Sequence, residues 1–175
     1  MALLPIIQLG HPTLRKRATE ITDFNEDLRT LARNMFDTMF EADGIGLAGP
    51  QVNVDKRIFV IDMSVLEEDL EPEAFINPEI LEKEGQVTME EGCLSIPGIS
   101  AEVDRPEKLA IRYQTLDGET VEEDIDGILA RVFQHELDHL DGVLFIDHLP
   151  TIQRKLLEPR LKKIRDQNAL SWGPI

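Results

Sequence analysis

Apolar residues recur at intervals of three and four along residues 25–43, a pattern that predicts an amphipathic helix. The positions of this apolar stripe are Leu28, Leu31, Met35, Phe36 and Met39. Asn25 suits the N-cap, and Glu26 and Asp27 suit the first turn, where carboxylates offset the positive end of the helix dipole. We expect this helix to end before Gly44.

The segments around this helix have other patterns. Residues 11–22 are broken by Pro12 and predict an irregular arm. Residues 57–63 are rich in Ile, Val and Phe and predict a strand, whereas residues 64–74 predict an acidic loop. Residues 75–121 hold several short β-like runs punctuated by glycine and proline.

Helical spacing returns in the last third of the chain. A second long helix should begin near Asp126 and end at Gly142, since glycine commonly closes a helix. A third helix should begin at Thr151 and be kinked or interrupted at Pro159. Strands in the middle and helices at either end predict an α+β fold, with antiparallel or mixed strands packed around the second helix.

Length and composition support one globular domain. The chain has 175 residues, of which 42% are hydrophobic and 30% charged, a mix that can bury a single core. We expect one domain over residues 1–175, in which residues 151–175 form a C-terminal helix and tail.

Two features of the composition bear on the compartment. No apolar run approaches the roughly 20 residues that span a bilayer, so we expect no membrane partner. The single cysteine cannot form an internal disulfide, which favours a reducing compartment. The sequence therefore predicts a cytoplasmic protein.

Charge is distributed unevenly. The net charge is −16, which argues against non-specific binding to nucleic acid by the whole molecule. Residues 151–168, however, carry six basic and two acidic side chains, a net charge of +4, while the other 12 basic and 32 acidic side chains give −20. The basic segment is either the solvated face of a terminal helix or a docking surface for an anionic partner.

The second predicted helix carries a possible metal site. His135 and His139 are four residues apart, so their imidazoles lie on one face of a helix and extend its apolar stripe of Ile128 and Val132. Two neutral imidazoles in an apolar wall favour a shared metal ion over two separate hydrogen-bonded histidines. Glu136 is adjacent and can act as general base towards a water on that ion.

A catalytic metal site needs a third protein ligand and an open position. The candidates are Cys93, a carboxylate, His11 and His148. The two histidines fit surface positions better. Cys93 follows Gly92, which permits a close approach by another backbone or a ligand, but a buried inert cysteine would look the same in isolation.

Residues 44–49 match the glycine pattern of dinucleotide-binding loops. That pattern requires a preceding strand and a following helix, whereas here a helix precedes it and Pro50 and a strand follow. We therefore expect no nucleotide cofactor. The segment leads instead into Gln51, which is either a turn residue or an oxyanion donor.

Three segments together resemble the peptide deformylase family. They are Gly44-Ile45-Gly46-Leu47-Ala48-Gly49-Pro50-Gln51, Glu91-Gly92-Cys93-Leu94-Ser95 and Gln134-His135-Glu136-Leu137-Asp138-His139. The last motif is shared with many metallopeptidases, but the three in this order and spacing are specific. The resemblance extends from the N-terminal arm to the C-terminal helix.

The resemblance implies a hydrolase that removes the formyl group from the N-terminal formyl-methionine of new polypeptides and releases formate. Cys93, His135 and His139 would bind one divalent metal ion, Fe(II), with Zn, Ni or Co able to substitute. Glu136 would be the general base and acid, and the Gln51 side chain and Leu94 backbone N–H would stabilise the oxyanion. The pocket for the methionine side chain would be lined by Ile45, Gly46, Glu91, Ile128 and Val132.

The resemblance also implies formylated nascent peptides as partners, and a ribosome contact through residues 151–168. Two positions depart from the family pattern. Gly49 stands where alanine is usual, which we expect to loosen the loop. Ser100 stands where some members carry an arginine, which leaves contacts beyond the first substrate residue open.

Two other functions compete with this interpretation. A general metallopeptidase shares the two histidines and the glutamate, but more often uses a carboxylate or a third histidine as its last ligand. A non-catalytic metal-binding module, such as a ribosome-associated factor that uses the basic residues 151–168, would have no need of Glu136 beside its ligands.

Overall fold

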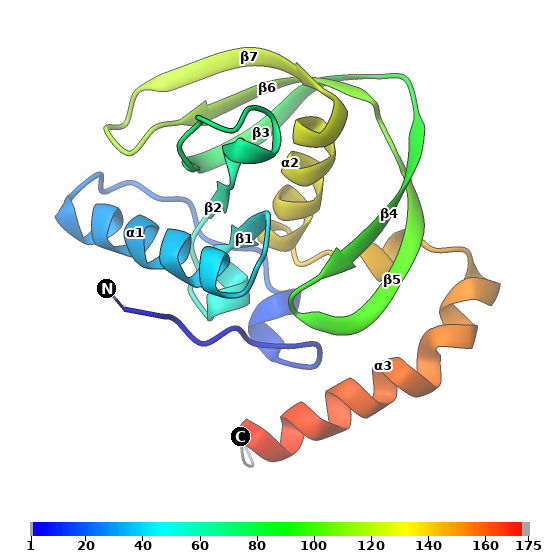
Figure 1. The fold of residues 1–175 in the computed structure, drawn as a ribbon. Helices are drawn as coiled ribbons and strands as arrows, with labels where there is room; N and C mark the ends of the chain where they lie inside the picture. The colour runs from blue at the N-terminus through cyan, green and yellow to red at the C-terminus, as the bar shows by residue number, and fades with distance from the viewer. Residues whose placement is uncertain (1, 173–175) are drawn as a thin grey trace.

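The centre of the molecule is the helix α2, Gly127–Leu140, which lies between the two β-sheets (Figure 1). The structure is a computed structural model that describes residues 2–172, with side chains as far as Asn168. The helix begins after Asp126, whose backbone is extended, and ends at Leu140, two residues before Gly142, whose φ of +75° is left-handed. Both ends lie where the sequence predicts them.

The larger sheet has five strands in the order β1-β2-β3-β6-β7, and each neighbouring pair is antiparallel. The strands are β1 Gly46–Ala48, β2 Ile58–Ile61, β3 Glu73–Glu84, β6 Lys108–Gln114 and β7 Thr120–Asp126. The second sheet is a two-stranded ribbon of β4, Val87–Cys93, and β5, Ile96–Arg105. This arrangement confirms the predicted α+β fold with antiparallel strands around a central helix.

Helices cover both faces of the larger sheet, which explains why every residue of β2 is buried. Ile58 and Val60 pack with the apolar stripe of α1, Glu26–Glu41, whereas Phe59 and Ile61 pack with α2. This alternation follows from the two-residue period of a strand. Edge-to-face contacts of Phe133 with Phe59 and Phe75 join α2 to the sheet, and Tyr113 extends the cluster through Phe75.

The ribbon packs against the C-terminal part of the chain. Its inward residues, among them Ile96 and Val103, share a core with Phe145, Leu161 and Ile164. Leu161 and Ile164 belong to α3, Thr151–Trp172, which continues through Pro159 without an interruption. In Figure 1 the axis of α3 changes direction after its first turns, in agreement with the predicted kink.

The N-terminal arm is irregular, as expected, and joins the two halves of the fold. It contains one 3₁₀ turn, Pro12–Arg15. The amide of Leu9 donates to the Ser95 carbonyl, and the amide of Ala18 donates to the Leu140 carbonyl at the end of α2. The arm therefore contacts both the ribbon and the helix that frame the site described below.

Three details differ from the sequence prediction. The short strand β1 was not expected, because three residues within a glycine-rich segment show no period. The strand β3 begins at Glu73, inside the predicted acidic loop, and β3 and β5 are longer than the short runs expected.

No helix within residues 2–172 is long and apolar enough to cross a membrane. The part of the predicted tail at residues 173–175 lies outside the described residues.

Gly142 offers a test of how tightly the end of α2 is fixed. An added Cβ would lie 2.7 Å from the carbonyl oxygen of Arg15, and φ is +75°. We expect Gly142→Ala to lower the free energy of unfolding by about 1–2 kcal/mol for the left-handed backbone, plus about 1–3 kcal/mol for the contact with Arg15. Urea denaturation measures the change.

Gly98→Ala is the matched control, because Gly98 has the same φ of +75° and no atom within 4 Å of the added Cβ. It should show only the backbone contribution. Equal losses in the two variants would contradict the close packing of the arm against Gly142.

Candidate metal centre

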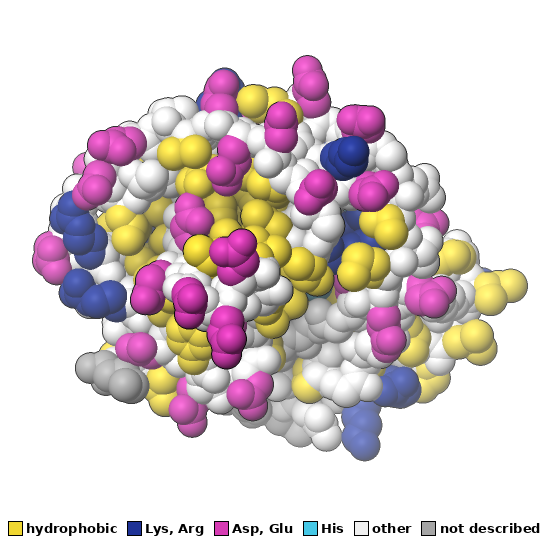
Figure 2. All heavy atoms as spheres, turned by 45° about the horizontal axis from the view of Figure 1, so that its top comes forward, with side chains coloured by type: hydrophobic (Ala, Val, Ile, Leu, Met, Phe, Trp, Pro, Cys, Tyr) yellow, Lys and Arg dark blue, Asp and Glu magenta, His cyan; other side chains and the backbone are white. Residues whose placement is uncertain are grey.

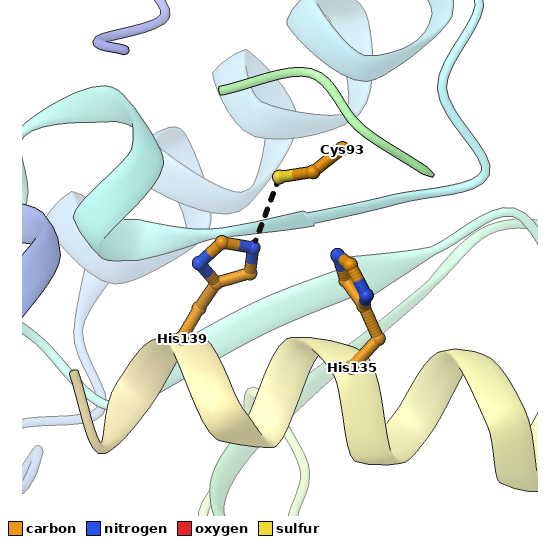
Figure 3. A group of neighbouring side chains, drawn as sticks. All are labelled: Cys93, His135 and His139. Atoms are coloured by element: carbon orange, nitrogen blue, oxygen red, sulfur yellow. Dashed lines mark hydrogen bonds between the residues drawn. The ribbon is translucent and has the colours of Figure 1, made fainter. Parts of the chain in front are cut away.

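Cys93, His135 and His139 meet at the junction of the ribbon and α2 (Figure 3). Cys93 is the last residue of β4, and the two histidines lie one turn apart on the helix. Their ligand atoms all lie within 4.8 Å of one another, and Cys93 Sγ is 3.3 Å from His139 Nε2. The structure thus brings together the three predicted ligands, although Cys93 lies more than 40 residues before the two histidines.

A hydrogen bond fixes the orientation of His135. Its Nδ1 lies 2.8 Å from Glu91 Oε1. With Nδ1 tied to a carboxylate, Nε2 is the nitrogen available to an ion, as in many histidine-bound metal sites. His139 Nδ1 is buried and has no hydrogen-bond partner among the described residues.

The donor set fits a divalent transition metal. One thiolate and two imidazoles are three of the ligands of a tetrahedral catalytic site, which leaves one position open. Burial lowers the pKa of His139, and the neighbouring His135 lowers it further, which favours the neutral ligand form. Burial also opposes the charge on His135, but its hydrogen bonds to Cys93 and Glu91 outweigh burial and raise its pKa. A metal ion would compete with that shared proton, since it binds deprotonated ligands.

Glu136 is buried beside the cluster and is only 4% exposed. Its Oε1 has no hydrogen-bond partner among the described residues, and burial raises its pKa to about 7. A cation bound nearby would lower that pKa again. Gly46 makes room for this carboxylate, because an added Cβ would lie 2.7 Å from Glu136 Oε2.

Gln51 is also buried and faces the cluster from the 3₁₀ turn Gly49–Val52. Its Oε1 accepts from the Ala48 amide at 2.9 Å, which fixes the direction of the side-chain amide. Its Nε2 donates to Ser95 Oγ at 3.1 Å and to Cys93 Sγ at 3.5 Å. The glutamine is therefore part of the site and does not lie exposed in a turn.

Gly49 lies in a closely packed turn, and the expectation that it loosens the loop stays a prediction. Gly49 is buried, and an added Cβ would lie 2.8 Å from the Lys56 carbonyl oxygen. The same turn explains why residues 44–49 are not a phosphate loop: the strand β1 lies inside the motif and only a 3₁₀ turn follows it.

A cavity of about 610 Å³ opens beside these residues. Its walls include Cys93, His135, Glu136, Gln51 and Leu94 together with the predicted pocket residues Ile45, Gly46, Glu91, Ile128 and Val132. Ser100 also borders it and donates to Glu90 Oε1 at 2.6 Å. Figure 2 shows one face of the molecule, on which acidic side chains are scattered around exposed hydrophobic surface.

The other two histidines lie apart from the cluster. His11 caps the 3₁₀ turn in the arm, where its Nδ1 accepts from the Thr13 amide. His148 Nε2 lies 2.8 Å from Asp138 Oδ2. Neither belongs to the metal-binding group found among the described residues.

The sequence analysis missed two arginines behind His135. Arg105 and Arg131 are each only 5% exposed, and both form ion pairs at 2.6 Å with Glu91 Oε2. Burial alone would raise the pKa of Glu91, but the bonds from His135 and Arg105 outweigh burial and hold it well below its usual value. Arg131 lies four residues before His135 and so shares its helix face, but an arginine at such a position is usually exposed, and no local signal marked Arg105.

Comparison with known proteins agrees with this geometry. A family model for polypeptide deformylases matches residues 3–155. A peptide deformylase of Acidobacterium capsulatum is 48% identical over 98% of this chain and 100% of its own length. A structure of peptide deformylase from Plasmodium falciparum is 39% identical, has a TM-score of 0.90, and covers 97% of this chain and 100% of that chain. One from Thermotoga maritima is 46% identical with a TM-score of 0.81, over 86% of this chain and 99% of that chain.

The cluster predicts that Cys93→Ser weakens metal binding. In Co(II)-loaded protein the thiolate-to-metal absorption band should disappear, and the dissociation constant for Co(II), measured by competition with a chelator, should rise. His11→Ala is the control, because His11 lies in the arm and should leave spectrum and affinity unchanged. An unchanged spectrum in Cys93→Ser would exclude Cys93 as a ligand.

Proposed function

The chain belongs to the polypeptide deformylase family, and on this premise we propose a role in the reaction for each residue around the cluster. The protein is a hydrolase that removes the N-terminal formyl group from polypeptides. The observation that supports our assignments best is the convergence of Cys93, His135 and His139 in one cavity with the buried Glu136.

We assign Cys93, His135 and His139 as the ligands of one divalent ion. The family resemblance favours Fe(II), and Zn, Ni or Co would suit the same donors. When bound, the ion supplies a water of lowered pKa and a Lewis acid for the formyl carbonyl. An iron-bound, partly exposed thiolate is open to oxidation, which suits the reducing conditions of the cytoplasm.

Glu136 acts as general base and then as general acid. Its Oε1 is free of protein hydrogen bonds among the described residues and lies in the wall of the cavity. There it accepts a proton from the attacking water and delivers it to the amine that leaves. Burial raises the pKa of Glu136 and a cation bound nearby would lower it, and these opposing effects suit a carboxyl group that first accepts and then donates a proton.

Gln51 and Leu94 stabilise the negative charge that develops on the formyl oxygen. The Gln51 amide is held by the Ala48 amide on its oxygen side, so its nitrogen stays directed at the cluster. Its contact with Cys93 Sγ at 3.5 Å is an ordinary N–H···S distance, and this N–H turns from the sulfur to the formyl oxygen as charge develops there. The Leu94 backbone N–H, next to Cys93, supplies the second donor.

The side chain of the first substrate residue occupies the apolar part of the cavity. Ile128 and Val132 lie on the same face of α2 as the two histidines, and Ile45 and Gly46 border the opposite side. An unbranched methionine side chain fits an apolar pocket of this kind. Glu91 borders the pocket, but its carboxylate is bonded to His135 and the two arginines.

Of the competing functions, a general metallopeptidase remains the nearest. The third member of the cluster is a cysteine rather than a carboxylate or histidine, which favours deformylation, as does the family match. A non-catalytic module would not bury a carboxylate such as Glu136 in a pocket wall at the cost of desolvation.

We also propose that the basic helix α3 contacts the ribosome. Lys155, Lys162 and Lys163 are exposed on this helix, while the rest of the chain is strongly acidic. Ribosomal RNA is a polyanion that attracts such a basic strip.

The proposed reaction is tested by formate release from a short N-formyl-methionyl peptide, with anaerobically prepared, Fe(II)-loaded protein. The wild type should release formate, and Glu136→Ala should retain the metal but lose turnover by about 10²–10⁴-fold, the usual contribution of a general base. Cleavage of unformylated peptides without formate release would favour the metallopeptidase instead. Wild-type turnover in Glu136→Ala would remove this residue as the base.

The ribosome contact is tested by charge reversal. Lys155→Glu, Lys162→Glu and Lys163→Glu together should abolish co-sedimentation with ribosomes at low salt but leave hydrolysis of a short peptide unchanged. Reversal of three exposed lysines elsewhere, Lys56, Lys83 and Lys108, changes the net charge equally and should have less effect. Equal effects of the two triples would show non-specific electrostatics, and no effect of the first would refute the contact.

A further inference from the structure

The buried Glu91 carboxylate receives hydrogen bonds from three side chains. Its Oε1 lies 2.8 Å from His135 Nδ1 and 2.9 Å from Arg105 Nη2. Its Oε2 accepts from Arg105 Nε and from Arg131 Nη1, each at 2.6 Å. A carboxylate held at both oxygens cannot rotate, so the direction in which it holds His135 is set by the two arginines.

The two arginines differ in what else they bind. Arg105 reaches outward, and its Nη1 donates to Asp138 Oδ2 at 2.8 Å. Arg131 reaches across the ribbon, and donates to the Val103 carbonyl at 2.8 Å and to the Val87 carbonyl at 2.7 Å. These carbonyls belong to opposite strands, β5 and β4, at the end of the ribbon remote from Cys93.

Arg131 therefore links the two elements that carry the cluster. It projects from α2 one turn before His135, and it holds the strand whose last residue is Cys93. One guanidinium thus bonds to both strands and to the carboxylate that orients a ligand. Its planar fork makes this possible, because Arg131 reaches the three acceptors through two nitrogens, Nη1 and Nη2, whereas a lysine presents all of its donors from a single nitrogen.

We propose that Arg131 is a positioning residue of the metal centre, which sets the orientation of His135 through Glu91 and the position of Cys93 through the ribbon. This inference rests on the proposed assignment of Cys93, His135 and His139 as ligands. It concerns how the ligands are held, and therefore applies to whichever divalent ion they bind.

The energetics argue against a role in stability alone. A buried ion pair gains little over well-packed apolar residues, because the desolvation of both charges offsets their attraction. Arg131 also keeps a buried Nε without a hydrogen-bond partner among the described residues. Such an arrangement is poorly explained by folding stability and well explained by the need to fix one geometry.

The test compares Arg131→Met with Arg57→Met. Arg57 is a matched control because it is also buried and also links a strand segment to α2, with bonds at 3.0 Å to the Leu140 carbonyl and to Asp141 Oδ1. Neither of these two bonds involves Glu91 or the ribbon. Both variants are loaded with Co(II), and the dissociation constant, the absorption spectrum and the urea midpoint are measured.

We expect Arg131→Met to raise the Co(II) dissociation constant by about 10–100-fold, the usual effect of losing an outer partner of a ligand, and to alter the thiolate-to-metal band. Arg57→Met should lower the urea midpoint and leave affinity and spectrum as in the wild type. Wild-type affinity and spectrum in Arg131→Met would refute the proposal, and so would equal losses of affinity in both variants.

Arg131→Lys keeps the test decisive if the methionine variant does not fold. It retains the charge and one donor to Glu91, so it should recover part of the affinity but not the wild-type spectrum. Full recovery of both affinity and spectrum would overturn the proposal that the Arg131 guanidinium positions the ligands. The Co(II) measurements need no formylated peptide. If Cys93→Ser also left the spectrum unchanged, the ligand assignment itself would have failed, which separates the two outcomes.

Discussion

The site depends on one buried interaction, the bonding of the Glu91 carboxylate to His135 and to two arginines. Cys93 belongs to the ribbon and the two histidines belong to α2, and no backbone ladder joins the ribbon to α2. Apolar packing is non-directional and would tolerate small shifts between these elements. Charged hydrogen bonds at 2.6–2.9 Å do not tolerate such shifts, because they depend on distance and direction. They convert approximate packing into a fixed separation between ligands.

Much of the site was predictable because its signals are local. The spacing of His135 and His139 gives their shared face from helix geometry alone, and Glu136 follows from its adjacency. The caps of the helices, Asn25 and Gly142, were also predictable, since capping depends on neighbours within a few residues. Cys93 was harder, because its partners are more than 40 residues away, and only the histidines of the predicted helix and the family resemblance, not its own surroundings, distinguished it from an inert cysteine.

The two buried arginines and the full lengths of the strands depended on long-range pairing that no local pattern encodes. Arg105 and Arg131 look like ordinary charged positions on a strand and a helix, and only the fold shows that both are buried against Glu91. The lengths of β3 and β5 escaped prediction for a similar reason. The outer half of β3 is mostly exposed, and β5 alternates between buried and exposed residues beyond its glycine, so their hydrogen bonds to neighbouring strands, not their composition, define their full lengths.

The position of Gln51 next to the Cys93 thiolate is relevant to the properties of a metal bound there. A thiolate donates more charge to a metal than a carboxylate does, which leaves the metal a weaker Lewis acid. Hydrogen bonds to a ligating sulfur reduce that donation, and Gln51 Nε2 and the Ser95 amide both lie within 3.5 Å of Cys93 Sγ. The same Gln51 nitrogen is directed at the cavity, where the formyl oxygen would lie. With the roles we propose, this one side chain would moderate the thiolate before the reaction and stabilise the oxyanion during it. The Ala48 amide and the packed Gly49 turn hold that side chain in place for both tasks.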